Sequence, residues 1–507
     1  MNRFVTGLVM LVGLFQSANA ADRRPNVLLI VGDDHRTEAI GAYGNKIVKT
    51  PNLDRLAESG ARFERAYCNS PMCTSSRQSF LVGQYPHATG VTLLPHALTE
   101  DTITLADRLR EAGYRTGAFG KMHFNSDKMH GFEVYAKPEQ FWREHGRRGD
   151  KPLPDGMEFL PQWRPFKDPA RIWLNSFYRP MGRYDDEMPD TWYARQAIEF
   201  MMKHAGEPFF VQVGFHQPHS PYQFPVEFAR KHDPVKMPVP EPGPEDAGQI
   251  PKIFTELTRE EKQGIVASYY TAVAYLDHNI GRLLSALEEL ELAENTLVIY
   301  LGDNGYHLGE HGRFEKHCFY ERAVGIPLIM SYPDRIMPNM STKALVEGVD
   351  IVPTVLDYLN LLTESIPTPD RVLHGVSLRR ILEGHVTGVR DAVFSEYQPT
   401  QQVMVRTDRH KLIYRTNTKE VDWLGYEPVD PKLGRAVWLY DLEADPEEMH
   451  NIAEDPANRP VVSALLDQLV NWYRRIPPRD ERIPGDLARI DLLDWAIAPR
   501  NVPPPRQ

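Results

Sequence analysis

Cysteine is scarce in this chain, which has only three in 507 residues: Cys68, Cys73 and Cys318. So few thiols exclude a disulfide framework, and the fold must depend on a hydrophobic core, for which the length is ample. If Cys73 serves another purpose, Cys68 and Cys318 remain as a candidate disulfide pair. The alternative is that both are buried free thiols.

Long apolar runs are also missing beyond the first twenty residues. Residues 5–15 are apolar, Arg3 precedes them and Ala18-Asn19-Ala20 follows, which is the pattern of a signal peptide. No later run approaches the roughly 20 apolar residues that a membrane helix needs. We therefore expect cleavage near Ala20 and a secreted or periplasmic protein without a membrane span.

Positive charge is in deficit, with 58 lysines and arginines against 69 acidic residues and a net charge of −11. A protein that binds nucleic acid through its phosphates needs a cationic surface. The balance therefore argues against nucleic acid as a partner.

Short apolar runs alternate with helical patterns along the first three quarters of the chain. This order predicts an α/β fold: a large, mostly parallel sheet sandwiched by helices. The strand-like runs are 25–31, 208–215 and 296–301, and the helical patterns are 51–59, 105–112 and 260–290. Residues 131–185 and 233–250 are rich in proline or lack a period, which predicts surface loops.

The pattern changes after about residue 385 to short strand-like runs, which predicts a smaller C-terminal α+β subdomain. These runs are 392–396, 402–406, 411–414 and 438–442. We therefore expect a signal peptide at 1–20, a main domain at 21–384 and a C-terminal subdomain with a small antiparallel sheet at 385–507.

Polar residues follow the strand-like runs at the point where each ends. Asp33-Asp34 follow the first, His216 follows the second and Asp303-Asn304 follow the third. Because ligands bind at the carboxyl ends of parallel strands, these side chains are expected to converge. Carboxylate and amide oxygens are the ligands that Ca²⁺ or Mg²⁺ prefers, so Asp33, Asp34, Asp303 and Asn304 are candidate metal ligands.

The segment Cys73-Thr74-Ser75-Ser76-Arg77 places a thiol one helical turn before an arginine. It resembles the signature of the sulfatase family, in which a cysteine or serine lies two residues before proline or alanine and four before arginine. Ser75 stands where proline or alanine is usual, and Gln84 replaces an arginine common at the end of the motif. In this family an enzyme reads the motif and oxidises the cysteine. The two departures therefore bear on how efficiently Cys73 would be converted.

The resemblance spans nearly the whole mature chain and implies an alkaline-phosphatase-like fold. It also implies that Cys73 is oxidised to formylglycine by a formylglycine-generating enzyme or an anaerobic sulfatase-maturating enzyme. The hydrated aldehyde would be both nucleophile and calcium ligand, so Cys73 joins Asp33, Asp34, Asp303 and Asn304 as a metal ligand.

Six catalytic positions follow from the same resemblance. Cys73 would supply the nucleophile, Arg77 could hold an anion beside it, and Lys121 and Lys316 would bind the sulfate. His123 would take a proton from the formylglycine hydroxyl, and His216 would donate one to the departing alcohol. His219 either lines the pocket or orders its loop, and His311 is expected to be structural.

The substrate is indicated less directly. The segments Ala66-Tyr67-Cys68-Asn69 and Gly309-Glu310-His311-Gly312 look most like the iduronate-2-sulfatase branch, which implies a sulfated carbohydrate. A carboxylated sugar would need a cationic subsite, for which the candidates are Arg143, Arg147, Arg148, Arg179 and Arg183. Two alternatives stay open: a phosphonate or phosphate monoester hydrolase of the same superfamily, and an inactive glycan-binding homologue in which Ser75 blocks maturation.

Overall fold

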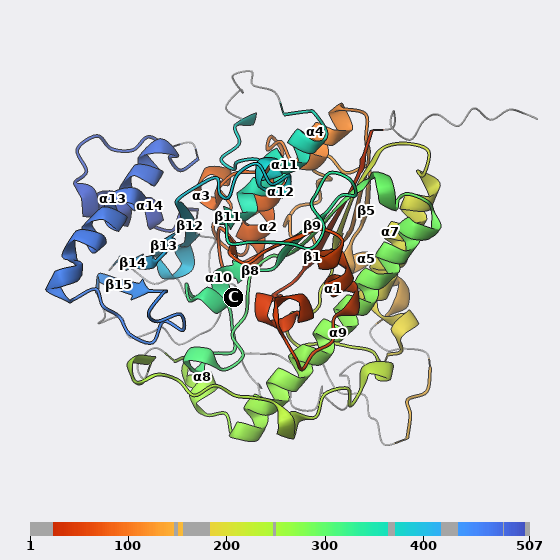
Figure 1. The fold of residues 1–507 in the computed structure, drawn as a ribbon, viewed down its shortest axis with the longest axis horizontal. Helices are drawn as coiled ribbons and strands as arrows, with labels where there is room; N and C mark the ends of the chain where they lie inside the picture. The colour runs from red at the N-terminus through yellow and green to blue at the C-terminus, as the bar shows by residue number, and fades with distance from the viewer. Residues whose placement is uncertain are drawn as a thin grey trace, which may run out of the picture.

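The computed structural model describes residues 24–146, 151–155, 183–246, 250–362, 371–416, 434–479 and 481–501. The expected signal peptide lies outside these ranges. Figure 1 shows a central sheet with helices packed on both faces, and a separate group of short strands and helices at the C-terminal end of the chain.

The central sheet has eight strands in the order β10-β2-β9-β7-β1-β6-β4-β5. The run from β7 to β5 is parallel, while β9 is antiparallel to both of its neighbours. The prediction of a mostly parallel sheet is therefore confirmed. The strands are β1 (Asn26–Gly32), β2 (Ala61–Phe63), β4 (Arg115–Gly120), β5 (Val134–Ala136), β6 (Phe209–Gly214), β7 (Thr296–Gly302), β9 (Leu328–Ser331) and β10 (Met340–Thr342).

Strand β1 is buried on both faces because helices cover both. Alternate residues point to opposite faces, so Leu28 and Ile30 enter one core while Val27, Leu29 and Val31 enter the other. The first core includes residues of α1 (Pro51–Glu58), α7 (Pro189–Lys203) and α9 (Arg259–Glu289). The second includes residues of α2 (Cys73–Val82), α4 (Leu105–Glu111), α11 (Ile351–Tyr358) and α12 (Arg379–Leu382).

The C-terminal group is an antiparallel sheet packed under two helices. Its strands pair in the order β12 (Ala392–Tyr397), β13 (Gln402–Thr407), β14 (His410–Arg415) and β15 (Ala436–Asp441). Residues of α13 (Arg459–Arg475) and α14 (Arg489–Ile497) share a core with this sheet. Figure 1 shows the two helices, in blue, beside it. Leu439, Leu469 and Leu493 lie in that core and are fully buried.

Several further short elements belong to the described part of the chain. A three-stranded sheet has the order β11-β3-β8, and the helices α3, α8 and α10 each have four residues. Their bounds are β3 (Ala66–Tyr67), β8 (Gly325–Ile326), β11 (Val346–Glu347), α3 (Pro86–Thr89), α8 (Lys252–Thr255) and α10 (Glu321–Val324).

The structure departs from the sequence prediction at residues 131–185, which were expected to be surface loop. The described part of this segment contains the edge strand β5 and α5 (Pro138–His145), whose Phe141 is buried. Pro138 begins the helix, a position at which proline is favoured. The helix is too short to show an apolar period.

The cysteines are free thiols rather than a disulfide pair. Cys68 and Cys318 are both buried, so the second of the two alternatives holds. The Cys318 Sγ lies 3.4 Å from Nε2 of His307. Within the described ranges, no helix has the length and apolar character needed to cross a membrane.

Candidate active site

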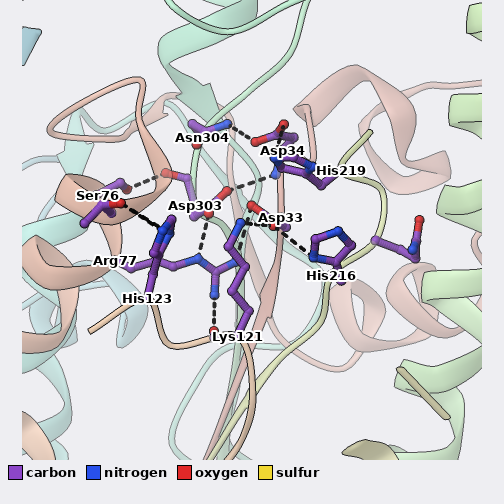
Figure 2. A network of polar contacts seen from close by, with 12 residues as sticks. Asp33, Asp34, Ser76, Arg77, Lys121, His123, His216, His219, Asp303 and Asn304 are labelled. Carbon is purple, nitrogen blue, oxygen red and sulfur yellow. Dashed lines mark hydrogen bonds and ion pairs between the residues drawn. The ribbon is translucent and has the colours of Figure 1, made fainter. Parts of the chain in front are cut away.

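Four neighbouring parallel strands bring the predicted site residues together. Asp33 and Asp34 follow β1, Lys121 and His123 follow β4, His216 follows β6, and Asp303 and Asn304 follow β7. Backbone hydrogen bonds join these strand ends: the Asp33 N–H donates to the Gln217 carbonyl at 3.1 Å and the Asp303 N–H to the Gly32 carbonyl at 3.1 Å. Figure 2 shows the side chains pointing toward one another.

Close backbone approach at the ends of β4 and β6 depends on glycine. Gly120 has φ +88°, and a Cβ added there would lie 2.2 Å from the Gly214 carbonyl oxygen. A Cβ on Gly214 would lie 2.1 Å from the Lys121 carbonyl oxygen. Side chains at either position would push Lys121 away from the acidic residues.

Cys73 is the first residue of α2, and its side chain is almost fully buried with 4% exposure. The Ser76 N–H donates to the Met72 carbonyl, which closes the first turn at 2.9 Å. A helix N-terminus carries partial positive charge and free N–H groups, so it favours an anion beside Cys73. Ser75 fits into the same helix, where its hydroxyl is buried and has no hydrogen-bond partner among the described residues.

The acidic residues form one buried cluster around Cys73. Ligand atoms of Asp33, Cys73 and Asp303 lie within 4.8 Å of one another, and so do those of Asp33, Asp34 and His219. The Asp34 N–H donates to Asp303 Oδ1 at 2.9 Å, which ties two of the carboxylates together through the backbone.

This donor set fits a hard divalent cation. Asp33 Oδ1 and Asn304 Oδ1 are buried and have no hydrogen-bond partner within the described ranges. The pKa of Asp303 is raised well above its usual value, first by burial and then by the charge of Asp33. Clustered carboxylates that repel one another, together with oxygens left without donors, are the features that Ca²⁺ or Mg²⁺ would satisfy.

Arg77 belongs to the acidic cluster rather than to an open anion site. Its guanidinium is buried, with Nε 2.8 Å from Asp303 Oδ2 and Nη1 2.5 Å from the Lys121 carbonyl oxygen. A third nitrogen, Nη2, lies 3.6 Å from Asp33 Oδ1. The one-turn spacing predicted from the sequence therefore places Arg77 on the same side as Cys73, where it orients two candidate metal ligands. The Ser76 hydroxyl also donates to the Asp303 carbonyl.

Two lysines flank the cluster, Lys121 at Asp33 and Lys316 at Asp34. Burial raises the pKa of the Cys73 thiol, but Lys121 and Lys316 outweigh burial and lower it. Burial also opposes charge on Lys316, yet Asp34 holds its pKa well above the usual value. Burial opposes charge on Lys121 in the same way, but Asp33 raises its pKa. Both lysines are therefore charged, and they supply the cationic surroundings that a sulfate group needs.

His123 lies against the residue that follows Cys73. Its Nε2 is 3.1 Å from the Thr74 hydroxyl, and its backbone has φ +64°. Burial, together with Lys121, lowers the pKa of His123 well below its usual value. The imidazole is therefore neutral at pH 7 and is able to accept a proton.

Two further histidines, His216 and His219, face the carboxylates, and their ring centroids lie 5.1 Å apart. His216 Nδ1 is 3.8 Å from Asp33 Oδ2, and His219 Nε2 is 3.8 Å from Asp34 Oδ2. His219 has features of both roles left open, because its Nε2 faces Asp34 while its Nδ1 lies 2.5 Å from the Ser220 carbonyl oxygen of its own loop. His311 lies elsewhere, where it bonds Asp246 at 2.8 Å and stacks on Tyr320.

Asp190 is a residue of the site that the sequence analysis missed. It is the second residue of α7 and is fully buried, and its two carboxylate oxygens accept the backbone N–H groups of His216 and Gln217, each at 3.0 Å. Gln217 in turn accepts from the Asp33 backbone, so Asp190 orients both strand ends. In the sequence, Pro189-Asp190 indicates only a helix start.

A cavity of about 1080 Å³ opens beside the site and is lined by Lys121, His123, His216, Trp142 and Arg143, among others. Of the five arginines proposed as a cationic subsite, Arg143 lines this cavity. Arg183 does not qualify, because it is buried and donates to the backbone carbonyls of Glu187, His145 and Gly146. Arg147, Arg148 and Arg179 lie outside the described residues.

Comparison with known proteins gives a consistent result. A family model described as Sulfatase matches residues 25–361, and one described as N-sulphoglucosamine sulphohydrolase, C-terminal, matches residues 309–475. An N-acetylglucosamine-6-O-sulfatase of Bacteroides thetaiotaomicron is 28% identical over 91% of this chain and 88% of its own length. The iduronate 2-sulfatase of Mus musculus is 25% identical over 88% of this chain and 94% of its own length.

Solved structures share the fold. The phosphonate monoester hydrolase of Agrobacterium radiobacter superposes with a TM-score of 0.72 at 24% identity, over 89% of this chain and 96% of that one. The family model covers well over half of the sequence. The chain belongs to the sulfatase family, and it is a sulfuric ester hydrolase.

Proposed function

We propose that this protein hydrolyses a sulfate ester on a sulfated carbohydrate, using a formylglycine made from Cys73 and a divalent cation. One observation supports this most strongly: Asp33, Cys73 and Asp303 present ligand atoms within 4.8 Å of one another, between Lys121 and Lys316. The saccharide substrate of the Bacteroides relative supports the choice of a carbohydrate.

Asp33, Asp34, Asp303 and Asn304 would hold the cation, preferably Ca²⁺. When bound, the cation supplies positive charge beside the sulfate oxygens and the nucleophilic oxygen at position 73. Arg77 keeps Asp303 in place through the bond at 2.8 Å. Lys121 and Lys316 orient the sulfate group from either side of the carboxylates.

The proton transfers fall to the histidines. His123, neutral and next to Thr74, accepts a proton from the hydroxyl at position 73. The departing alcohol needs a proton, and the sequence assigned this role to His216. His216 lines the cavity beside the site, and His219, which lies at Asp34 with Lys316, is a second candidate for this donor. Burial, His219 and Lys121 lower the pKa of His216 to about 3, so it is neutral at pH 7.

The proposal is tested on protein produced with and without a maturating enzyme. Matured protein should show the mass of formylglycine at position 73, release sulfate from 4-nitrophenyl sulfate or defined sulfated saccharides, and lose activity on chelation and regain it with Ca²⁺. Cys73→Ala should fold and show no turnover. Turnover by Cys73→Ala would rule out this nucleophile.

The same assay decides between this function and its alternatives. Faster turnover of an aryl phosphonate than of the matching aryl sulfate would identify a phosphonate monoester hydrolase. An unmodified thiol after co-expression, combined with saccharide binding and no turnover, would identify a glycan-binding homologue. Export is also part of the proposal, and sequencing the N-terminus of the exported protein should show cleavage after Ala20.

A further inference from the structure

The large cavity beside the active site extends beyond the residues that would act on the sulfate group. Lys121, His123 and His216 form one part of its wall, and residues of α5 form another part of the same cavity. Its volume is about 1080 Å³. Ligand sites in proteins commonly measure about 300–1,000 Å³, so this cavity has room for more than the unit that carries the ester.

Three residues of α5 line the cavity together: Glu139, Trp142 and Arg143. Their spacing of three and four residues places them on one face of the helix. Phe141 is instead buried, and its ring centroid lies 5.8 Å from that of Trp192 on α7. This contact anchors α5, so the three side chains, called here the α5 face, are carried by a fixed element.

The indole of Trp142 is partly exposed, and two neighbours hold it in place. The ring of Phe141 meets it edge-on with the ring centroids 4.9 Å apart, and the Arg183 guanidinium lies 5.7 Å from its ring centre. Arg183 is itself fixed by backbone carbonyls. A tryptophan held in this way offers a rigid apolar surface at low entropic cost, which suits the C–H face of a sugar ring.

The two charged residues of the α5 face are exposed and available to a ligand. Neither Glu139 nor Arg143 has a hydrogen bond or an ion pair with any residue that the structure describes. Lys137, which also lines the cavity, pairs with Asp127 at 3.3 Å. The α5 face therefore presents both an acceptor and a donor with no net charge, which matches hydroxyl groups better than an anion.

Adjoining side chains also link the α5 face to the reacting groups. Burial raises the pKa of Tyr193, and nearby negative charges, among them Asp190 and Glu139, raise it further. Tyr193 lines the cavity and is thus near both acids. Asp190 in turn accepts the backbone N–H of His216 at 3.0 Å. A ligand with its sulfate at the acidic cluster therefore has the α5 face within the same cavity.

We propose that the α5 face binds an uncharged sugar unit next to the unit whose sulfate ester is cleaved. The inference rests on the proposed function, and it makes the substrate an oligosaccharide with a neutral neighbouring unit. Trp142 stacks on the apolar face of that unit, Glu139 accepts from its hydroxyls and Arg143 donates to its oxygens. A carboxylated unit fits less well, because Glu139 lies one helical turn from Arg143 and repels it.

Calorimetric binding to the Cys73→Ala protein in the presence of Ca²⁺ tests the α5 face without turnover. The first probe is N-acetylglucosamine 6-sulfate, chosen because the Bacteroides relative is named for this unit. The other two are disaccharides that join it to N-acetylglucosamine or to glucuronic acid. The neutral disaccharide should bind about tenfold more tightly than the monosaccharide. The acidic disaccharide should gain less.

Two further substitutions in the Cys73→Ala protein separate the parts of the α5 face. Trp142→Leu should remove the gain for both disaccharides. Glu139→Gln should act in opposite directions, weakening the neutral disaccharide by about threefold and strengthening the acidic one by about threefold, because a charged acceptor and a repulsion are lost together. Trp495→Leu on α14 is the matched control: this tryptophan is also partly exposed, with the Arg500 guanidinium 4.8 Å from its ring centre, and its loss should leave binding unchanged.

Equal affinity for the monosaccharide and the neutral disaccharide, or no binding of any probe, would overturn the inference. Unchanged binding by both folded α5 variants, or a preference for the acidic disaccharide, would overturn it as well. The proposed function is judged separately, by sulfate release from 4-nitrophenyl sulfate, which has no second sugar unit. In matured enzyme, kcat/KM for the neutral disaccharide, divided by that for the monosaccharide, should fall about tenfold in Trp142→Leu.

Discussion

At the scale of single residues, the acidic cluster divides the site into two halves. Lys121 and His216 lie at Asp33, whereas Lys316 and His219 lie at Asp34. Each half thus pairs one lysine with one histidine. If His219 and Lys316 face the leaving group, the variants of the two histidines should differ in their effects on turnover.

We expect His219→Ala to lose more activity on poor leaving groups than on good ones. A sugar alcohol needs a proton as it departs, whereas 4-nitrophenolate leaves without one, so loss of the donor should cost about 10²–10⁴-fold only on the alcohol. His216→Ala should lower the rate on both substrates by similar factors. The measurement is kcat/KM against leaving-group pKa, and a steeper slope for His216→Ala would return the donor role to that residue.

Asp190 should make the stability of the protein depend on pH. Burial is the main cause that raises its pKa to about 7, whereas an aspartate in an unfolded chain titrates near 3.9. The folded state therefore binds more protons between about pH 4 and 7, and its stability falls as pH rises through that window.

Wild type should therefore lose more free energy of unfolding between pH 4 and pH 8 than Asp190→Asn, by an amount on the order of 1–3 kcal/mol. Denaturant titrations at both pH values measure it. Asp334→Asn, at an exposed position, serves as the control and should follow wild type. Parallel pH dependence in wild type and Asp190→Asn would show that Asp190 is ionised throughout.

At the scale of elements, the sequence predicts the site wherever a strand and its polar end are adjacent in the chain. The apolar run before Asp33-Asp34 is β1, and the run before Asp303-Asn304 is β7, with bounds within a residue or two of prediction. Parallel strands place their carboxyl ends together, which is why residues 270 positions apart could be grouped.

The sequence could not reveal contacts that depend on how elements pack. Asp190 bonds to backbone groups of another segment, and no side-chain pattern marks such partners. Arg77 was placed on the correct face by helical spacing, but its bond to Asp303 depends on where α2 sits against β7.

The helix that carries Cys73 ends at a glycine that should be hard to replace. Gly83 has φ +77°, its N–H donates to the Ser79 carbonyl at 2.8 Å, and an added Cβ would lie 2.8 Å from Leu373. We expect Gly83→Ala to lower the free energy of unfolding by about 2 kcal/mol or more, from strain and overpacking together.

Thermal or denaturant unfolding measures the effect of Gly83→Ala. Gly206→Ala provides a matched control, because no atom lies within 4 Å of its added Cβ. If Gly83→Ala and Gly206→Ala were equally stable, the end of α2 would not require a residue in the left-handed conformation.

At the scale of the whole molecule, a buried lysine joins the C-terminal sheet to the central domain. Lys411 on β14 is fully buried, with Nζ 2.8 Å from Glu321 of α10, 2.6 Å from Glu448 and 2.8 Å from the Phe319 carbonyl. Removing the Lys411 ammonium group would leave Glu321 and Glu448 buried with uncompensated negative charge.

Lys411→Met should therefore destabilise the protein by about 3–5 kcal/mol in denaturant unfolding. Arg409→Met, two residues away in an exposed pair with Asp441, should change stability little. A small effect at both positions would mean that the subdomain docks mainly through apolar contacts.

The position of Cys73 has a consequence for the order of events in the cell. With 4% of its surface accessible and its sulfur enclosed by carboxylates and lysines, the folded cysteine is closed to a second protein. Under the proposed function, an enzyme that converts Cys73 would have to reach it before it is buried, so conversion should precede folding. A molecule that folds around an unconverted thiol would then be expected to stay inactive until it unfolds.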